Sequence, residues 1–523
     1  KPALLIENDG RYALRATRAP MAIPATLQDS LIERLERLSP VKEVAQIGSA
    51  IGREFSYDLL AGVTELRENE LKEALGQLAN AELVYVRGEP PDATYVFKHA
   101  LVQDAAYASL LRARRQQIHS RIAQVLPKKF PDLIARQPET LAHHCEAAGL
   151  EAAAKEYWSR AGRLALMNAT YAEATNHFAK ALALVAKEAA SEAKIREESG
   201  LLLDRGIAML ALKGPPSAEH ARIAADALTA SAPLGDDALH FRARWADWIV
   251  HSVGGKLPEA AERADALVGI ANRIGADDLR LQAHHARWTT AFARGHVTIA
   301  KDAVENWLAL YDLGRHREHW SMYGAHDPGV CACSIGAITF WQAGFAARAQ
   351  TLYKQGIGLG AELGHPFSVA AAHMHGTFFA MMVNDSAAAD VSVRTVTAVA
   401  TEANLAWPGR LGRFLKGWVM ARQGEIGRGA DQMEASFRDL QERKERLYLT
   451  LLGTLLVSAK LEIGRYEETL AFLDELQVLS VETHQRLFVP EHHRLRAETM
   501  HRLNPKNPGI EAEYGRALKL AQE

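Results

Sequence analysis

Cysteine and aromatic residues are scarce in this sequence of 523 residues. The chain holds three cysteines, Cys145, Cys331 and Cys333, and aromatic residues make up 7% of it. A small, odd number of cysteines cannot build a disulfide framework and is typical of a reducing compartment, so we expect a cytoplasmic protein. The shortage of aromatic residues, beside abundant alanine, favours helices over sheets.

An excess of charge of one sign is also lacking, since the formal net charge is −2. This balance predicts neither nucleic acid nor an acidic membrane surface as a partner. Residues 330–347 have the length of a membrane span, but Gln342 and many small residues predict a buried helix in a helical stack. The chain begins with Lys1 and no charged-then-apolar signal segment follows, which indicates a fragment or a processed piece.

Catalytic and metal-binding motifs are missing as well. The sequence has no G-x-x-x-x-G-K-[ST], G-x-S-x-G, H-E-x-x-H or paired C-x-x-C. Adjacent histidines such as His284 and His285 point roughly 100° apart on a helix and cannot chelate alone. The Cys331-Ala332-Cys333 spacing is not that of a zinc site. We therefore expect no enzyme activity, no catalytic residue, no cofactor and no metal in this chain.

The first quarter of the chain mixes helices with short strands. A turn at residues 8–10 predicts a hairpin over residues 6–14, and Thr26 is a suitable cap for a helix that carries Leu27, Leu31, Leu35 and Leu38. Further helices are expected over three segments, and two strands follow them around Gly88, Pro90 and Pro91. Helices followed by a hairpin predict a winged-helix-like domain. The expected ranges are 39–52, 55–63 and 68–84 for the helices, 85–97 for the strands, and 100–126 for a linking helix.

A repeat organises the chain from about residue 150 onward. A turn residue is followed five positions later by a small residue, at spacings of 40, 49, 40, 40, 40 and 40. The first can adopt a left-handed turn between two helices, and the second lets those helices pack closely. We therefore predict a TPR-like α-solenoid of about 40-residue helical hairpins. The pairs are Gly255/Ala260, Gly295/Ala300, Gly344/Ala349, Asn384/Ala389, Gly424/Gly429, Gly464/Thr469 and Asn504/Gly509.

The single spacing of 49 marks an insertion around residues 316–329. Loops inserted on one face of a solenoid often bind ligands, so Tyr323, His326 and Asp327 are candidate partner- or ligand-binding residues on the concave face. The alternative is a rigid corner that merely absorbs the nine extra residues.

Basic residues are concentrated in residues 95–136, which hold eight Lys or Arg and two acids. The helix that would enter a DNA groove, over residues 68–84, is acidic and would be repelled by phosphate. We therefore expect no nucleic acid. The basic residues form either a solvated helix face or a contact with an acidic or phosphate-bearing neighbour in the same protein.

Three phrases near the start carry a family resemblance: IPATLQDSLIERLERL, QIGSAIGREFSYDLL and YVFKHALVQDAAYASLLRARRQQIHSRIA. They resemble the STAND-class signalling ATPases of bacteria, in the subgroup where a class III adenylate/guanylate cyclase and an AAA-like ATPase domain precede a tetratricopeptide arm. Stretches of the arm are similar too: LQAHHARW, YGAHDPGVCACS, ELGHPFSVA and EHHRLRAETM. The cyclase domain and both Walker motifs of that family are absent from this sequence.

The resemblance implies a division into three parts: the tail of an ATPase module (1–26), a winged-helix-like domain with its linking helix (27–126) and a superhelical sensor arm (127–523). It implies ATP or ADP with Mg in the ATPase module rather than here. His99, with Lys98 beside it, stands where a histidine of related switch proteins senses the phosphate of bound ADP. The alternative is that His99 only caps the joint between hairpin and helix.

The resemblance also implies a function. The arm would bind a protein or small-molecule effector on its concave face and, through intramolecular contact with the ATPase module, control a nucleotide switch and cyclic-nucleotide synthesis. A stand-alone TPR-like scaffold for protein partners is the main alternative. A MalT-like transcription regulator is less favoured, because no helix-turn-helix follows the arm in this sequence.

Overall fold

A computed structural model describes residues 5–8, 11–14 and 39–522 of the chain. The chain divides into two compact units, Lys1–Tyr157 and Trp158–Glu523. This division falls after the predicted start of the arm at residue 127, and the three-part domain organisation stays a prediction. The helix expected to begin at Thr26 lies outside the described residues.

The predicted N-terminal hairpin is present. Strand β1 (Leu5–Asn8) pairs antiparallel with β2 (Arg11–Leu14), and the register places Asn8 opposite Arg11.

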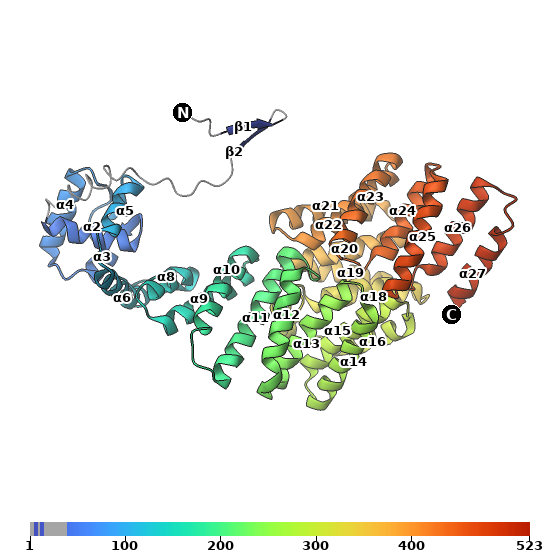
Figure 1. The fold of residues 1–523 in the computed structure, drawn as a ribbon, viewed down its shortest axis with the longest axis horizontal. Helices are drawn as coiled ribbons and strands as arrows, with labels where there is room; N and C mark the ends of the chain where they lie inside the picture. The colour runs from blue at the N-terminus through green and yellow to red at the C-terminus, as the bar shows by residue number, and fades with distance from the viewer. Residues whose placement is uncertain (1–4, 9–10, 15–38, 523) are drawn as a thin grey trace. The chain divides into compact units, whose positions relative to one another are not determined.

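The rest of the first unit begins with a small α+β arrangement (Figure 1). Its three-stranded antiparallel sheet has the order β3-β5-β4. Phe55, Tyr95 and Phe97 pack together on this sheet, with ring centroids 5.5–5.6 Å apart, and all three are buried. The elements are α2 (Ser39–Ile51), β3 (Glu54–Ser56), α3 (Tyr57–Val63), α4 (Glu68–Asn80), β4 (Val84–Arg87) and β5 (Thr94–Phe97).

Two details of this unit differ from the prediction. Residues 54–56 form a strand, and the helix expected from Phe55 begins at Tyr57, because the Ser56 hydroxyl caps it by accepting the Leu59 N–H at 3.2 Å. The single helix expected over residues 100–126 is divided at Ser109. The unit continues with α5 (Ala100–Ala108), α6 (Arg112–Lys129), α7 (Pro131–Arg136) and α8 (Pro138–Ala147), and α9 (Glu151–Met167) spans the division between the units.

The second unit, which we call the arm, is a TPR-like solenoid of antiparallel helical hairpins, as predicted (Figure 1). Its remaining elements are α10 (Tyr171–Val185), α11 (Glu192–Lys213), α12 (Ala218–Ser231), η1 (Ala232–Leu234), α13 (Asp237–Val253), α14 (Leu257–Ile274), α15 (Asp277–Arg294), α16 (Val297–Leu310), α17 (Leu313–His316), η2 (His319–Ser321), α18 (Pro328–Gln342), α19 (Ala346–Leu363), α20 (Pro366–Met382), α21 (Ser386–Glu402), α22 (Ala406–Arg422), α23 (Ile426–Glu442), α24 (Leu449–Glu462), α25 (Tyr466–Thr483), α26 (Val489–Leu503) and α27 (Ile510–Gln522).

The turn residues of the repeat adopt the predicted left-handed backbone. Gly255, Gly295, Gly344, Asn384, Gly424 and Gly464 all have φ between +56° and +99°. The small partners five residues later are buried against the preceding helix. Asn504 is the exception, because its φ of −151° is extended, so the last hairpin turns differently.

The arm closes on itself, because corners about five hairpins apart meet. The Arg446 N–H donates to the Val253 carbonyl at 2.8 Å. A buried ion pair joins Arg410 to Glu445, and Arg410 Nη2 also donates to the Lys213 carbonyl at 3.2 Å. Connecting segments of distant hairpins therefore contact one another across the inner side of the superhelix.

Helix α18, the segment that imitates a membrane span, is buried over most of its length, as predicted. Among the residues that the structure describes, no helix is both long enough and apolar enough to span a membrane.

Candidate functional site

Lys98 and His99 lie between strand β5 and helix α5. His99 is the N-cap residue of α5, but its side chain is exposed and makes no capping hydrogen bond. Lys98 Nζ lies 3.1 Å from Glu82 Oε2 and 5.3 Å from the centroid of the Tyr85 ring. The His99 side chain is thus free of a capping task, whereas Lys98 is engaged by a carboxylate.

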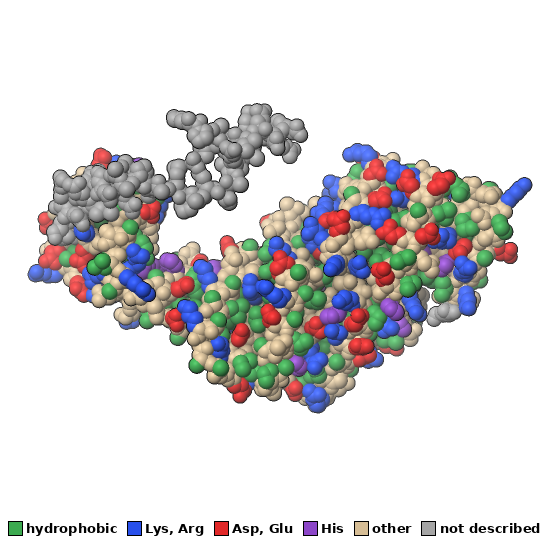
Figure 2. All heavy atoms as spheres, viewed as in Figure 1, with side chains coloured by type: hydrophobic (Ala, Val, Ile, Leu, Met, Phe, Trp, Pro, Cys, Tyr) green, Lys and Arg blue, Asp and Glu red, His purple; other side chains and the backbone are tan. Residues whose placement is uncertain are grey.

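Some of the basic residues that follow form ion pairs within the first unit. Arg114 pairs with Glu43 at 2.5 Å, Lys129 pairs with Asp58 at 2.6 Å, and Arg121 pairs with Glu65. These contacts show that acids of the same unit meet part of the basic stretch, which is one of the two alternatives that the sequence left open. On the face of the arm drawn in Figure 2, acidic and basic side chains are likewise interspersed.

Residues 311–327 connect α16 to α18 and contain most of the predicted insertion, so we call them the inserted segment. This segment does not project its predicted binding residues. Tyr323 and Asp327 are buried, with 4% and 0% of their surface exposed, and His326 is half-buried. The expectation that these side chains reach out from a loop is therefore wrong in its geometry. They face the interior because the segment folds back onto α13, α15 and α20.

Asp327 organises the end of this segment. Its carboxylate caps α18 by accepting the N–H groups of Gly329 at 2.7 Å and Val330 at 3.1 Å, and it accepts the Tyr311 hydroxyl at 3.0 Å. Its own N–H donates to Ser368 Oγ at 2.8 Å. Burial raises the pKa of Asp327 to about 6 although these hydrogen bonds oppose the shift. The residue is held by four partners and serves the fold of the segment.

Tyr323 and His326 belong to a buried cluster of aromatic and histidine side chains. Tyr323 contacts Trp245 at a ring distance of 5.5 Å, and His326 meets His285 edge-on at 5.6 Å. His285 in turn stacks on Trp288 at 5.0 Å. Burial lowers the pKa of His326 to about 4 and that of His285 well below its ordinary value, so both imidazoles are neutral near pH 7.

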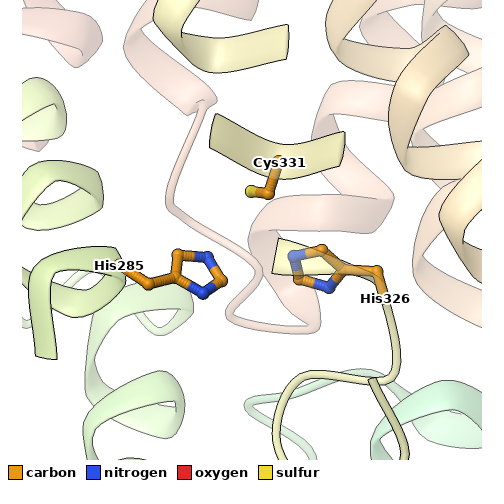
Figure 3. A group of neighbouring side chains, drawn as sticks. All are labelled: His285, His326 and Cys331. Atoms are coloured by element: carbon orange, nitrogen blue, oxygen red, sulfur yellow. The ribbon is translucent and has the colours of Figure 1, made fainter. Parts of the chain in front are cut away.

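Cys331 completes this cluster from the first turns of α18. A nitrogen of His285, a nitrogen of His326 and the Cys331 sulfur lie within 4.8 Å of one another. Figure 3 shows the two rings side by side, with the Cys331 sulfur above the space between them. Two imidazoles and one thiol are a donor set that metal ions accept.

Sequence reasoning did not find this group. It treated the histidine pairs and Cys331 separately, and each alone is an ordinary buried residue. A usable signal was the 41-residue distance from His285 to His326, because residues about one repeat apart lie on neighbouring hairpins.

A second group nearby combines Asp278, His316 and His319. Here hydrogen bonds already occupy the ring nitrogens of His316 that could bind a metal ion. His316 Nδ1 accepts the Asp312 N–H at 2.9 Å, and His316 Nε2 therefore carries the proton that it donates to Asp278 at 3.1 Å. This second group is a satisfied polar network.

An apolar cavity lies in the arm between α11, α12 and α13. Trp245 lines it, and the indole N–H of Trp245 is buried without a hydrogen-bond partner among the described residues. Met322, which is 38% exposed, lies on the same cavity. The other lining residues are Leu202, Leu203, Gly206, Ile207, Leu210, His220, Ile223, Ala224, Arg242, Ala246, Ile249 and Tyr323.

Comparison with known proteins gives one curated relative and several structural neighbours. No protein family that has been described matches the chain. An uncharacterized protein of Rhizobium meliloti (strain 1021) is 24% identical over 503 residues, which are 94% of this chain and 48% of that protein. The chain therefore spans about half the length of the curated relative that it matches.

Among solved structures, a Rap protein complexed with Competence and Sporulation Factor has a TM-score of 0.51 at 12% identity, and the match covers 72% of this chain and 98% of that chain. A STAND protein with a tetratricopeptide repeat sensor from Pyrococcus horikoshii gives 0.36 at 9% identity, covering 95% and 66%. The APC/C hetero-tetramer Cut9-Hcn1 gives 0.38 at 11%, covering 95% and 97%. The likeness to Rap shows the fold of the arm.

Proposed function

We propose that this chain is the regulatory half of a STAND-type signal-transduction protein, in which the arm binds a partner and thereby controls a nucleotide switch. Three observations support the proposal. The arm is a TPR-like scaffold suited to protein interaction. The sequence around residues 95–123 resembles that family. The curated relative has about as much sequence outside the matched part as within it, which leaves room for a nucleotide-binding module.

The cavity between α11, α12 and α13 carries the binding role. Its lining is mostly apolar, and Met322 at its edge is 38% exposed, so a partner can reach it there. We propose that a protein segment places one apolar side chain over the cavity, against Met322.

His99 carries the proposed link to the nucleotide. It stands at the first turn of α5, where unpaired backbone N–H groups and the helix dipole favour an anion. An exposed imidazole with no capping bond can donate to a phosphate oxygen there. Lys98 would assist only after it leaves Glu82, so we give His99 the main role and Lys98 the lesser one.

The proposed mechanism is a shift of population. A partner that binds one state of the arm more tightly than the other moves the equilibrium of the nucleotide module by that difference in affinity. Where the whole protein carries a cyclase domain, the output would be cyclic-nucleotide synthesis. A stand-alone scaffold would share the partner site but would give His99 no role.

Site-specific photo-crosslinking tests the partner site. A benzophenone amino acid replaces Met322 at the cavity, or Val391, which is 53% exposed on α21, as the control position. We expect position 322 to crosslink one protein that position 391 does not. The same products at both positions would contradict the proposal.

A further inference from the structure

We propose that His285, His326 and Cys331 form a binding site for a divalent metal ion of the zinc class. The three residues come from α15, from the end of the inserted segment and from α18, and their ligand atoms lie within 4.8 Å of one another (Figure 3). The proposal does not rest on the proposed partner binding or on the proposed nucleotide switch, although Trp245 of the cavity packs on His285.

The hydrogen bonds around the two histidines leave the ligand atoms free. His326 Nδ1 lies 2.7 Å from the Gly324 carbonyl, which can only accept, so Nδ1 carries the proton and Nε2 has the lone pair. That Nε2 is buried and has no partner among the described residues. His285 Nδ1 likewise lies 3.4 Å from a carbonyl oxygen, Gln282 Oε1, to which it can donate its proton. Metal-bound histidines are oriented in this way, with the second ring nitrogen donating to a carbonyl oxygen.

The neighbouring group of Asp278, His316 and His319 provides an internal contrast. There His316 uses both ring nitrogens, one as an acceptor from the backbone and one as a donor to Asp278. Gln282 connects the two groups, because its Nε2 donates to His319 Nδ1 at 3.1 Å while its Oε1 faces His285. His316 therefore has a hydrogen bond at each ring nitrogen, whereas His326 Nε2 keeps an unused lone pair beside a thiol.

The donor set selects the metal. Two imidazoles and one thiolate suit zinc, which binds tetrahedrally and leaves a fourth position to water or to a ligand. Tetrahedral zinc requires donor atoms about 3.3–3.6 Å apart, so small rotations of the Cys331 and His326 side chains would close the site.

Metal binding here would fasten the inserted segment to the hairpins on either side of it. The Cys331 thiol would lose its proton when the ion binds, and that proton would pass to solvent. In the absence of the ion, burial raises the pKa of this thiol, so the thiol stays protonated.

Cobalt(II) tests the site because a thiolate ligand gives it a charge-transfer absorption band. The whole chain, freed of purification tags and of metal with a chelator, is titrated with cobalt(II) and then with zinc(II). We expect one equivalent of cobalt to produce the band and zinc to displace it. No band, or no zinc binding by calorimetry, would overturn the proposal.

Matched variants locate the ion. Cys331→Ala should abolish the band and weaken zinc binding by at least about 100-fold, while Cys333→Ala, a buried thiol on the same helix, should leave both unchanged. His326→Gln should weaken binding comparably, and His284→Gln should not. Circular dichroism confirms that each variant is folded. Binding that survives Cys331→Ala and His326→Gln would place the ion elsewhere and overturn the assignment.

Discussion

The regular hairpins of the arm and its inserted segment turn the chain from one helix to the next in different ways. At a regular corner, one glycine or asparagine with positive φ turns the chain, and a small residue five positions later admits the next helix. In residues 311–327 the turn is held by side chains: Tyr311 donates to Asp327, Asp312 caps α17, and Asp327 caps α18.

This difference shows where polar chemistry can accumulate in a solenoid. The turn residue at these regular corners is a glycine or the exposed Asn384, which adds no buried polar side chain. The inserted segment brings histidines, tyrosine and aspartate into the interior, and some of their atoms, such as His326 Nε2, remain unpaired. A departure from the repeat is therefore the place to search for a site.

The largest effect is expected from the buried ion pair between Arg410 of α22 and Glu445 of the α23–α24 connection, beside the end of α11. Glu445→Gln leaves the Arg410 guanidinium, whose side chain is 10% exposed, without its counter-charge. We expect a loss of about 4 kcal/mol in the free energy of unfolding, measured by urea titration and circular dichroism. The exposed control Glu442→Gln should change it by less than about 0.5 kcal/mol. Equal values would mean that closure of the arm does not depend on this pair.

The next effect concerns the close approach of α22 and α23. A Cβ atom at Gly429 would lie 2.5 Å from the Gly417 carbonyl oxygen and 2.8 Å from the Ala421 nitrogen, both in the backbone. Gly429→Ala should therefore cost about 2–3 kcal/mol. Gly427→Ala, on the same helix with open space around it, should cost nothing in the same measurement. A neutral Gly429→Ala would show that the small residue of the repeat is not needed for packing.

In the inserted segment, Tyr311→Phe removes the hydroxyl that donates to buried Asp327. We expect a loss of about 2 kcal/mol in the free energy of unfolding, because hydrogen bonds to charged groups are worth about 1.5–3 kcal/mol. Tyr514→Phe, at a tyrosine that is 43% exposed, is the control and should be neutral. If both variants match the wild type, side-chain contacts do not hold the segment.

The smallest effect is a dependence on pH at the joint between the two regions. His365 caps α20 and stacks on Trp320, with ring centroids 3.9 Å apart. It also lies near Tyr171 and His326. Burial lowers the pKa of His365 to about 3. The unfolded state binds the proton more tightly, so stability is fully present above about pH 6.5 and falls as the pH decreases. Between about pH 7.5 and 5.5 the loss is about 1.4 kcal/mol.

His365→Asn keeps a capping oxygen and removes the titrating group. Its free energy of unfolding should therefore fall less over the same pH range, when both proteins are titrated with urea at each pH. Parallel pH profiles for the variant and the wild type would assign the acid sensitivity to other groups.

The regular part of the arm was predictable because each repeat carries a turn residue and, five positions later, a small residue that can be recognised in the sequence. The turn at Gly295 and the close packing at Ala300 depend on these two local residue types and not on distant parts of the sequence. The break at Ser109 was not predictable, since neither proline nor glycine marks it, and strand β3 was missed because Phe55 pairs with residues forty positions away.

The candidate sites were less predictable for the same physical reason. Tyr323, His326 and Asp327 were selected as an exposed loop, but their positions depend on Ser368, Trp245 and His285, which lie on other hairpins. His99 was placed correctly at the joint between strand and helix, since a local pattern determines that joint. Its role in phosphate sensing stays a prediction.

The measurement that tests the central claim most directly is calorimetry of ADP binding by a protein in which this chain is joined to the ATPase module that we propose for it. We predict that His99→Ala weakens ADP binding by about tenfold or more, because it removes one hydrogen bond to a charged oxygen. His501→Ala, at an exposed histidine of α26, should leave the affinity unchanged. Unchanged ADP affinity in a folded His99→Ala protein would contradict the account and leave the chain a scaffold for partner proteins.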